Sequence, residues 1–193
     1  DPGVIFIDRI NEFNPNPKLG SIESTDSCGE QPLLPYESCN LGSVNLSNML
    51  ENIKINFRKL KITIHTAIHL LDNVIDMCNY PLKENRKIVY KNRKIGLGVM
   101  GFADMLVKLG IAYDSEEGLK TAEQIMEFIS KEASIASTEI VKKRDMFPSW
   151  KNSIYNHKSM HFKGCHILLR NATRTTIAPT GTISIIADTS SGI

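Results

Sequence analysis

Apolar side chains recur with helical spacing in two long stretches of the chain. The first stretch predicts a helix from about residue 57 to 79, which Pro81 ends because proline cannot continue a helix. The second predicts a longer helix over about 115–144, which begins at the cap residues 114–117 (Asp-Ser-Glu-Glu) and ends in the basic cluster 142–144. Its apolar stripe consists of Leu119, Ala122, Ile125, Ile129, Ala133, Ala136 and Ile140.

Shorter elements complete the pattern. A third helix is predicted over 102–109, where Gly110 ends it. Strand-forming residues dominate 175–178 and 183–187, on either side of a Pro-Thr-Gly turn, and 41–50 mixes such residues with glycine and serine. Strands that alternate with helices indicate the α/β class.

Prolines and glycines interrupt the chain between residues 11 and 38. The segment contains Pro15, Pro17, Pro32, Pro35, Gly20 and Gly29. That density excludes a long helix and predicts an ordered but irregular loop. A second loop, on the surface, is predicted over 145–165.

The composition provides a core and an almost balanced charge. Of 193 residues 41% are hydrophobic, and 23 basic against 21 acidic residues leave a formal net charge of +2. No basic block predicts a nucleic-acid partner, no apolar run reaches the roughly 20 residues that span a bilayer, and the start lacks the basic residues of a signal peptide. We expect a cytoplasmic protein with no membrane or nucleic-acid partner. Both ends are interpreted as cuts in a longer polypeptide.

The four cysteines differ in their surroundings. Cys78 and Cys165 are interpreted as buried or incidental thiols, and no Cys-x-x-Cys or zinc-ribbon spacing occurs. His65 and His69 have the spacing of a metal pair, but no glutamate lies beside them as in His-Glu-x-x-His, and we predict no metal site. Cys28 lies in a proline-rich loop.

The segment 26–30 (Asp-Ser-Cys-Gly-Glu) places Cys28 two residues from the Glu30 carboxylate. A second cysteine, Cys39, follows at the start of a strand-like run. A cysteine sulfur exists as thiol, thiyl radical or disulfide, and a nearby carboxylate accepts a hydroxyl proton. This arrangement suits one-electron chemistry on a hydroxylated substrate.

These residues resemble the finger loop of ribonucleotide reductases, whose usual pattern is Asn-Pro-Cys-Gly-Glu followed by a Cys-Asn-Leu-Gly-Ser strand. The segments 91–104, 170–173, 178–187 and 190–193 resemble other blocks of the same family. The resemblance implies part of a ten-stranded α/β barrel of two five-stranded halves. Its central finger loop would be about 20–38, its helical segments would lie within about 57–144, and its phosphate-binding turn would be about 178–186.

The resemblance also implies a role for each site residue. Cys28 would become the thiyl radical that removes hydrogen from ribose C3′, and Glu30 would take the proton of the 3′-hydroxyl. Cys39 would be half of the dithiol that reduces C2′, with a partner on an earlier strand. The substrate diphosphate would bind Pro179, Thr180, Gly181, Thr182, Ile183 and Ser184. A glycine turn with small hydroxyl residues frees backbone N–H groups for an anion.

Cofactor and partners follow from the same resemblance. These sequence blocks look most like those of the adenosylcobalamin-dependent class. The alternative is a radical supplied by a metal-containing partner subunit. A ribonucleoside di- or triphosphate substrate, nucleotide effectors bound outside this chain, a thioredoxin-like reductant and a homo-oligomeric parent are implied. The fragment alone is expected to be inactive.

One departure from the family pattern concerns Asp26, which stands where the family has asparagine, while Ser27 replaces its proline. An asparagine side chain donates and accepts hydrogen bonds, whereas an ionised aspartate only accepts. A second negative charge near Glu30 should raise the pKa of one carboxyl. The departure makes full activity doubtful.

Two alternatives remain open. A non-catalytic remnant or structural module of the barrel would account for Asp26. A dinucleotide-binding oxidoreductase would use Gly96-x-Gly98-x-x-Gly101. However, the preceding Lys-Asn-Arg-Lys-Ile is a poor buried strand, and no strand ending in an acidic residue follows about 20 positions later. We interpret these glycines as residues that let a helix pack closely.

Overall fold

A parallel pair of strands runs through the middle of the molecule. The computed structural model describes residues 3–193, and in it β3 (Asn40–Asn45) pairs with β6 (Ile95–Met100) along their whole length. Thr175 forms a parallel bridge to Leu97 on β6. The α/β class is confirmed. Within the described residues the strands form two-stranded sheets, and no closed barrel is present.

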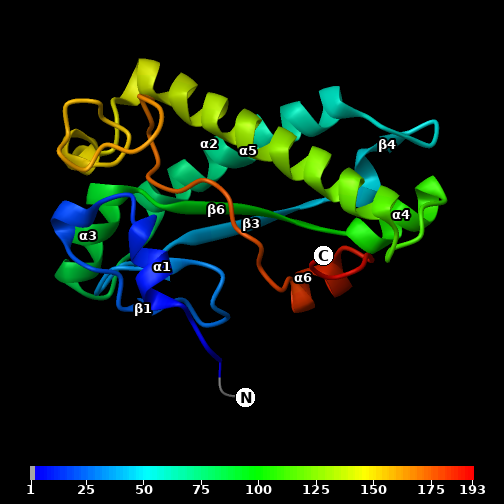
Figure 1. The fold of residues 1–193 in the computed structure, drawn as a ribbon, viewed down its shortest axis with the longest axis horizontal. Coiled ribbons are helices and arrows are strands. Elements are labelled where there is room, and N and C mark those ends of the chain that lie inside the picture. The colour runs from blue at the N-terminus through cyan, green and yellow to red at the C-terminus, as the bar shows by residue number, and fades with distance from the viewer. Residues whose placement is uncertain (1–2) are drawn as a thin grey trace.

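Helices cover one side of this pair (Figure 1). The long helices α2 (Phe57–Met77) and α5 (Glu116–Arg144) pack on each other, and α2 also contacts both strands. The other side carries α1 (Ile7–Glu12), the β1 (Ser24–Thr25) and β2 (Pro32–Leu33) hairpin, and α6 (Gly181–Ile186). The remaining elements are η1 (Pro17–Leu19), η2 (Leu46–Met49), β4 (Leu50–Glu51), β5 (Lys54–Ile55), α3 (Lys83–Asn92), α4 (Phe102–Leu109) and η3 (Pro148–Asn152).

The predicted long helices are confirmed. Helix α5 begins where the Ser115 hydroxyl accepts a hydrogen bond from Gly118 N, and Gly110 ends α4 in the left-handed conformation. The α5 stripe is buried at Ile125 and Ile129, but Leu119 is 64% exposed. At about 100° per residue, Leu119 falls outside the arc that the other apolar positions occupy.

The segment 183–187, predicted as a strand, lies mostly in α6. Within residues 3–193 no strand pairs with its β-branched residues, and Thr180 O accepts a helical hydrogen bond from Ser184 N. Ile185 is 80% exposed, so the run buries little apolar surface. Strand propensity reflects packing on a sheet, which this segment lacks.

Two further segments differ from the prediction. Helix α3 was not predicted, because charged residues dominate it and only one apolar side chain, Val89, is buried. The loop 145–165 is not entirely superficial: Phe147 and Trp150 are buried against Leu169 in a small second core.

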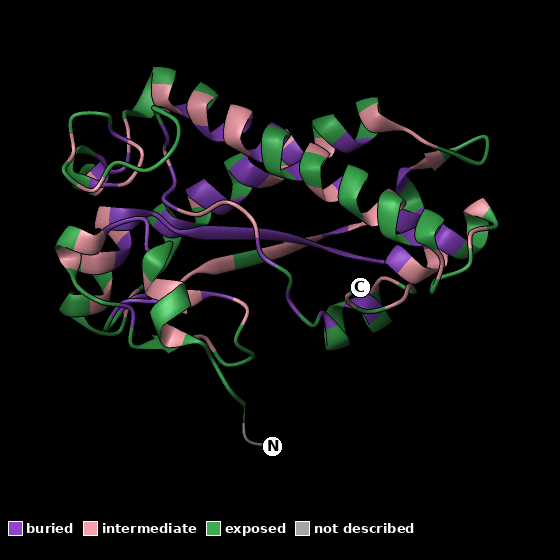
Figure 2. Cartoon of the chain, viewed as in Figure 1, coloured by how far each residue is buried: buried purple, intermediate pink, exposed green. Residues whose placement is uncertain are grey.

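Strand β6 is buried at every position (Figure 2). The preceding residues 91–94, interpreted as a poor buried strand, lie outside it: α3 ends at Asn92, and Arg93 and Lys94 join that helix to β6. Parallel strands covered on both faces read as continuous apolar runs. A Cβ on Gly98 would lie 2.6 Å from Thr176 O, and one on Gly96 would lie 2.8 Å from the Thr176 side chain. These glycines therefore admit a neighbouring chain segment and not a helix.

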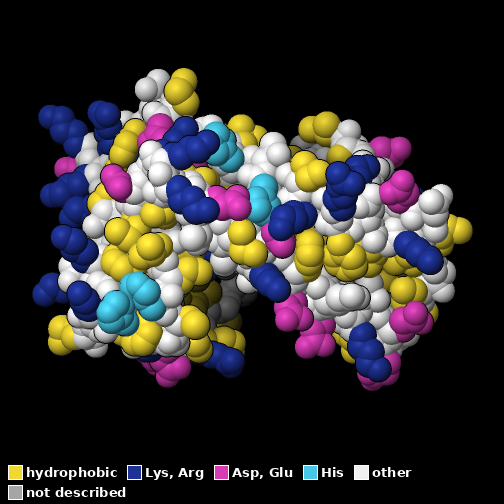
Figure 3. Space-filling view, turned by 90° about the horizontal axis from the view of Figure 1, so that it is seen from above, with side chains coloured by type: hydrophobic (Ala, Val, Ile, Leu, Met, Phe, Trp, Pro, Cys, Tyr) yellow, Lys and Arg dark blue, Asp and Glu magenta, His cyan; other side chains and the backbone are white. Residues whose placement is uncertain are grey.

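The outer face over α2 and α5 carries charges of both signs (Figure 3). Lys and Arg side chains gather most densely toward the end where α5 finishes in Lys142, Lys143 and Arg144. The sequence-predicted loop and turn lie on the other side of the strands. Of the described helices, none has the length and apolar character to cross a membrane.

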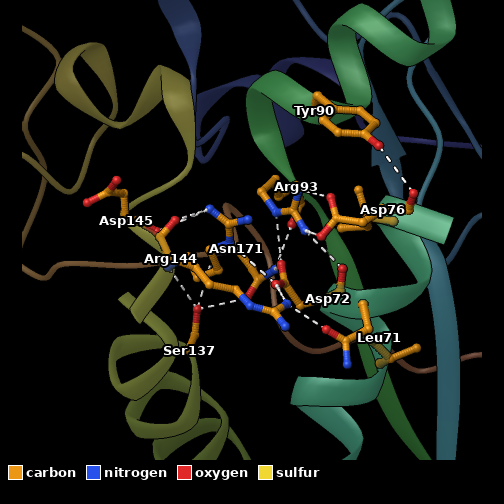
Figure 4. Close-up of polar contacts among 12 residues, drawn as sticks. Leu71, Asp72, Asp76, Tyr90, Arg93, Ser137, Arg144, Asp145 and Asn171 are labelled. Atoms are coloured by element: carbon orange, nitrogen blue, oxygen red, sulfur yellow. Dashed lines mark hydrogen bonds and ion pairs between the residues drawn. The ribbon is translucent and has the colours of Figure 1, made fainter. Parts of the chain in front are cut away.

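A buried carboxylate joins four parts of the chain (Figure 4). Asp72 of α2 is fully buried; its Oδ1 accepts from Arg93 Nε at 2.9 Å and from Asn171 Nδ2 at 3.0 Å. Its Oδ2 accepts from Arg170 Nε at 3.3 Å and from Arg144 at 3.4 Å. Asp72 thus connects α2 with the start of β6, the end of α5 and the segment after the second core.

The network continues outward to Asp76. Arg93 donates to both Asp76 oxygens, at 2.8 and 2.9 Å, and these bonds hold the pKa of the Asp76 carboxyl below its usual value. Arg93 has a φ of 48°, a conformation that costs energy for a residue with a side chain. The ion pairs of its guanidinium offset that cost.

Replacing Gly98 by alanine is expected to destabilise the fold by about 1–3 kcal/mol, because the new methyl group would collide with Thr176 O. Gly42→Ala on the adjacent strand is the matched control, since its Cβ would meet Leu71 at an ordinary 3.6 Å. Urea unfolding of both variants measures the difference. Equal stability of the two would contradict the close approach.

Asp72→Ala is expected to cost about 3–5 kcal/mol of unfolding free energy, because it leaves buried arginines without a counter-charge. Asp76→Ala should cost clearly less, since the Asp76 side chain is 40% exposed and water can replace it. The contribution of Asp76 is present above its unfolded pKa and is lost as the pH falls through its lowered folded pKa. Unfolding at neutral and acidic pH tests both statements.

Candidate active site

The predicted finger loop folds as a tight hairpin. Asp26 N donates to Gln31 O at 3.0 Å, and Gln31 N donates to the Asp26 carboxylate at 3.1 Å. Gly29, at a φ of 85°, makes the turn that only glycine adopts without strain. The irregular, ordered loop predicted over 11–38 is confirmed, with β1 and β2 as its short paired segments.

Cys28 lies exposed at the tip of this hairpin. Its Sγ is 3.8 Å from Ser27 Oγ, and the thiol is free. An exposed sulfur at a loop tip is open to a substrate or to a group that generates a radical. That Cys28 is the catalytic thiol stays a prediction.

Glu30 lies at the base of the tip, partly buried. Its Oε2 is buried and has no hydrogen-bond partner among the described residues. Burial raises the pKa of the Glu30 carboxyl, and the neighbouring Asp26 carboxyl raises it further. A raised pKa and a free oxygen equip Glu30 to take a proton from a substrate hydroxyl.

Cys39 lies at the foot of the loop, immediately before β3, and is partly buried. Burial raises the pKa of its thiol strongly, and Sγ donates to Asn40 O at 3.5 Å. Cys28 and Cys39 are not bridged. Cys78 and Cys165 are also free, and both are exposed, so these two thiols are not buried.

The predicted phosphate-binding turn begins in a left-handed residue. Thr180 has a φ of 56° and precedes α6, and its hydroxyl accepts from Gly192 N at 2.7 Å. Within the described chain, no side chain caps this helix end. The first amides of a helix, here those of Gly181, Thr182 and Ile183, have no intrahelical acceptor. They are available to an anion.

Thr176 connects the loop with the chain segment that leads to this turn. Its hydroxyl donates to Glu30 O at 2.7 Å, and its amide donates to Leu97 O at 3.1 Å. Pro179 follows three residues later, and Figure 1 shows α6 on the same side of β3 and β6 as the loop. That the turn and Cys28 face one cavity stays a prediction. Nothing in the sequence marked Thr176 as the contact.

A cavity of about 560 Å³ lies beside the loop but not at Cys28. Its lining is mostly apolar and comes from α1, the preceding residues and the start of β2, with Lys94 and Thr173 behind. Neither Cys28 nor any residue of 179–184 lines it. The groove is therefore separate from the predicted catalytic groups.

Of the two histidines of α2, His65 joins this helix to α5. His65 Nε2 is 2.8 Å from Glu132 Oε2, and His65 Nδ1 is 3.3 Å from Glu139, both on α5. His69 lies 3.2 Å from Asn73 on its own helix. Across residues 3–193, no three His, Cys, Asp or Glu side chains are arranged to hold a metal ion.

Sequence reasoning missed a buried ion pair beneath the loop. Lys94 Nζ is 2.7 Å from Glu37 Oε2, and the two side chains are 1% and 0% exposed. Lys94 belongs to the charged run before Ile95, which by itself indicates a solvated segment. The only available signal was the alternation from charged to apolar residues at the start of β6.

Comparison with known proteins connects this geometry with one family. The model for "Ribonucleotide reductase, barrel domain" matches residues 1–193. The chain is 52% identical over 194 residues to the vitamin B12-dependent ribonucleoside-diphosphate reductase of Thermoplasma acidophilum, and 46% identical over 193 residues to the protein of that name from Mycobacterium tuberculosis. A solved structure, the Actinobacillus ureae class Id ribonucleotide reductase alpha subunit, matches with a TM-score of 0.79 at 25% identity and covers the whole chain and 36% of that subunit.

The fold is thus that of a ribonucleotide reductase barrel, of which these strands and helices form one part. The chain belongs to the ribonucleotide reductase barrel-domain family. Both alignments include the whole of this chain. They span only 24% of the Thermoplasma protein and 27% of the mycobacterial one.

Asp26→Asn is expected to lower the pKa of the Glu30 carboxyl, because it removes a like charge from beside that group. The asparagine Oδ1 can keep the bond from Gln31 N, so the hairpin should persist. Titration of Glu30 by carbon-13 NMR measures the shift. In the full-length parent, turnover at neutral pH should rise and the acid limb of the pH–rate profile should move to lower pH. Identical profiles for the two proteins would show that the departure is neutral.

Proposed function

We propose that the protein containing this chain reduces ribonucleotides to deoxyribonucleotides by a thiyl-radical reaction. The observation that carries the proposal is the hairpin that presents an exposed Cys28 two residues from Glu30, within a chain that matches the family over its whole length. The relatives with the highest identity quoted above are named ribonucleoside-diphosphate reductases. We therefore propose a ribonucleoside diphosphate as substrate.

The proposed reaction uses the three site groups in order. The Cys28 thiyl radical takes the hydrogen atom from C3′, and Glu30 accepts the 3′-hydroxyl proton. The C2′ hydroxyl leaves as water. Cys39 and an upstream cysteine supply two electrons and two protons and become a disulfide, after which Cys28 returns its hydrogen atom to C3′. The sum is ribonucleotide plus dithiol giving deoxyribonucleotide, disulfide and water.

The substrate diphosphate is proposed to bind the turn at Pro179, Thr180, Gly181, Thr182, Ile183 and Ser184. Support comes from the uncapped start of α6 and from the left-handed Thr180, which turns the chain just before it. The Thr180 hydroxyl accepts a hydrogen bond from Gly192 N, and this bond stabilises the left-handed conformation. A nucleotide bound there would need its ribose to reach the hairpin tip.

The radical source is proposed to be adenosylcobalamin, because the named relatives are vitamin B12-dependent. When bound, that cofactor supplies the radical that Cys28 receives. The described residues provide the receiving thiol, and Cys28 does not line the cavity near the loop. A radical from a metal-containing partner subunit is the alternative.

Other partners are proposed for the parent protein as a whole. A thioredoxin-like dithiol would reduce the disulfide, nucleotide effectors would bind outside this chain, and the parent would be a homo-oligomer in the cytoplasm. The glycine pattern at 96–101 does not support a dinucleotide site, because Gly96 and Gly98 lie inside a buried strand and not in a loop. The second candidate function is a non-catalytic barrel module, which Asp26 beside Glu30 favours.

Cys28→Ser in the full-length parent is expected to reduce deoxynucleotide formation to background while substrate binding persists. The serine O–H bond is too strong for the hydrogen-atom relay. Cys78→Ser is the matched control, because that thiol is exposed and distant in sequence from the loop. Product formation by chromatography and substrate binding by calorimetry give the two readouts. Appreciable reduction by Cys28→Ser removes Cys28 from the mechanism, and an inactive parent with normal binding favours the non-catalytic module.

A further inference from the structure

A buried lysine lies beneath the finger loop, where a charged ammonium group is costly unless it is paired. Lys94 Nζ is 2.7 Å from Glu37 Oε2 and donates to Pro32 O at 2.9 Å. Both partners belong to the chain that returns from the hairpin tip toward β3. The ammonium therefore joins the strand β6 to the returning arm of the loop.

The carboxylate partner is itself held on all sides. Glu37 Oε2 accepts from Leu34 N at 2.8 Å, and Oε1 accepts from Asn92 Nδ2 at 2.6 Å. Asn92 Oδ1 in turn accepts from Asn16 Nδ2 at 2.9 Å. With so many bonds, neither charge of the pair has freedom to move away.

The strand register places this pair beside Cys39. Asn40 pairs with Ile95 in the parallel ladder, so Cys39 and Lys94 are the residues that enter the two strands one step earlier. Residues at equivalent positions of adjacent parallel strands project to the same face. Glu37, the ion-pair partner of Lys94, is two residues before Cys39 in the sequence.

We propose that Lys94 is a positioning residue for Cys39, whose fixed ammonium, held by Glu37 and Pro32 O, stabilises the thiolate of Cys39 when the active-site disulfide is opened. The proposal rests on the proposed function, in which Cys39 is half of the reducing dithiol. An external dithiol reduces that disulfide by attack of a thiolate on one sulfur, and the other sulfur leaves as a thiolate until a proton reaches it. The external dithiol supplies the two electrons and is oxidised to its own disulfide.

The charges around Cys39 explain why one cation matters. They are Lys94, Glu37, Asp26 and Glu30, and the three carboxylates all disfavour a thiolate. Burial also raises the pKa of the thiol, and Lys94 opposes both effects. Removal of Lys94 should make Cys39 a poorer leaving group and a slower nucleophile.

The test is the alkylation rate of Cys39 in the reduced full-length protein, followed with iodoacetamide across pH and quantified for each cysteine by mass spectrometry. At pH values below the pKa of the Cys39 thiol, Lys94→Met should slow Cys39 alkylation about tenfold or more. This corresponds to a rise of the thiol pKa by about one unit or more. Glu37→Gln should accelerate it, because a carboxylate is removed and an acceptor oxygen remains. Lys94→Arg should restore most of the rate. Cys78 and Cys165 are exposed internal standards that should not change.

The opposite signs separate electrostatics from structure. A merely structural pair would make Cys39 more accessible in both variants, so acceleration by Lys94→Met as well as Glu37→Gln would overturn the proposal. Unchanged rates in both variants would also overturn it. If circular dichroism shows that Lys94→Met does not fold, Glu37→Gln decides together with amide hydrogen exchange of β3. Faster alkylation with unchanged exchange supports the proposal, whereas faster alkylation with faster exchange, or no acceleration, would overturn it. Alkylation rates do not depend on turnover. If they contradict the role of Lys94, the proposed reaction is unaffected. If the full-length protein is inactive, the alkylation rates can still be measured.

Discussion

The buried Asp72 carboxylate is the interaction on which the rest of the structure depends. It has no exposure to solvent and is balanced by arginines that come from three other parts of the chain. Arg93 stabilises a left-handed turn at the end of α3, and that turn aims β6 into the core. A buried carboxylate with one cation removed would be costly, so the four segments must assemble together.

Contacts from β6 and the residue before it position the candidate site. Lys94 directly follows Arg93 and holds the returning arm of the loop, while Leu97 pairs with the segment that contains Thr176. Thr176 then binds Glu30 O. The loop is therefore positioned by the Lys94–Glu37 ion pair, by the Thr176 hydroxyl and by a bond from Gln31 Nε2 to Thr173 Oγ1.

The pair Asp26 and Glu30 combines a structural with a chemical effect. Asp26 closes the hairpin through Gln31 N, a bond that asparagine can also accept. Its negative charge, however, adds to burial in raising the pKa of the Glu30 carboxyl. The departure from the family pattern is therefore compatible with the loop shape and raises the pKa of the neighbouring Glu30 carboxyl.

The sequence by itself determined the helices α2 and α5, the irregular loop and the Cys28-x-Glu30 pattern, because periodicity, capping and turn residues act over a few positions. It did not determine that β6 is buried, that 181–186 is helical, or that Lys94 is inside. Charged residues before Ile95 indicate a solvated segment until Glu37 and Asp72, distant in sequence, supply counter-charges. The isoleucines of α6 indicate a strand until it is known that no strand of the described part of the chain lies beside them. Such pairings between remote residues arise only in the tertiary structure. Burial there makes an unpaired charge costly, and a segment becomes a strand only where another strand lies beside it.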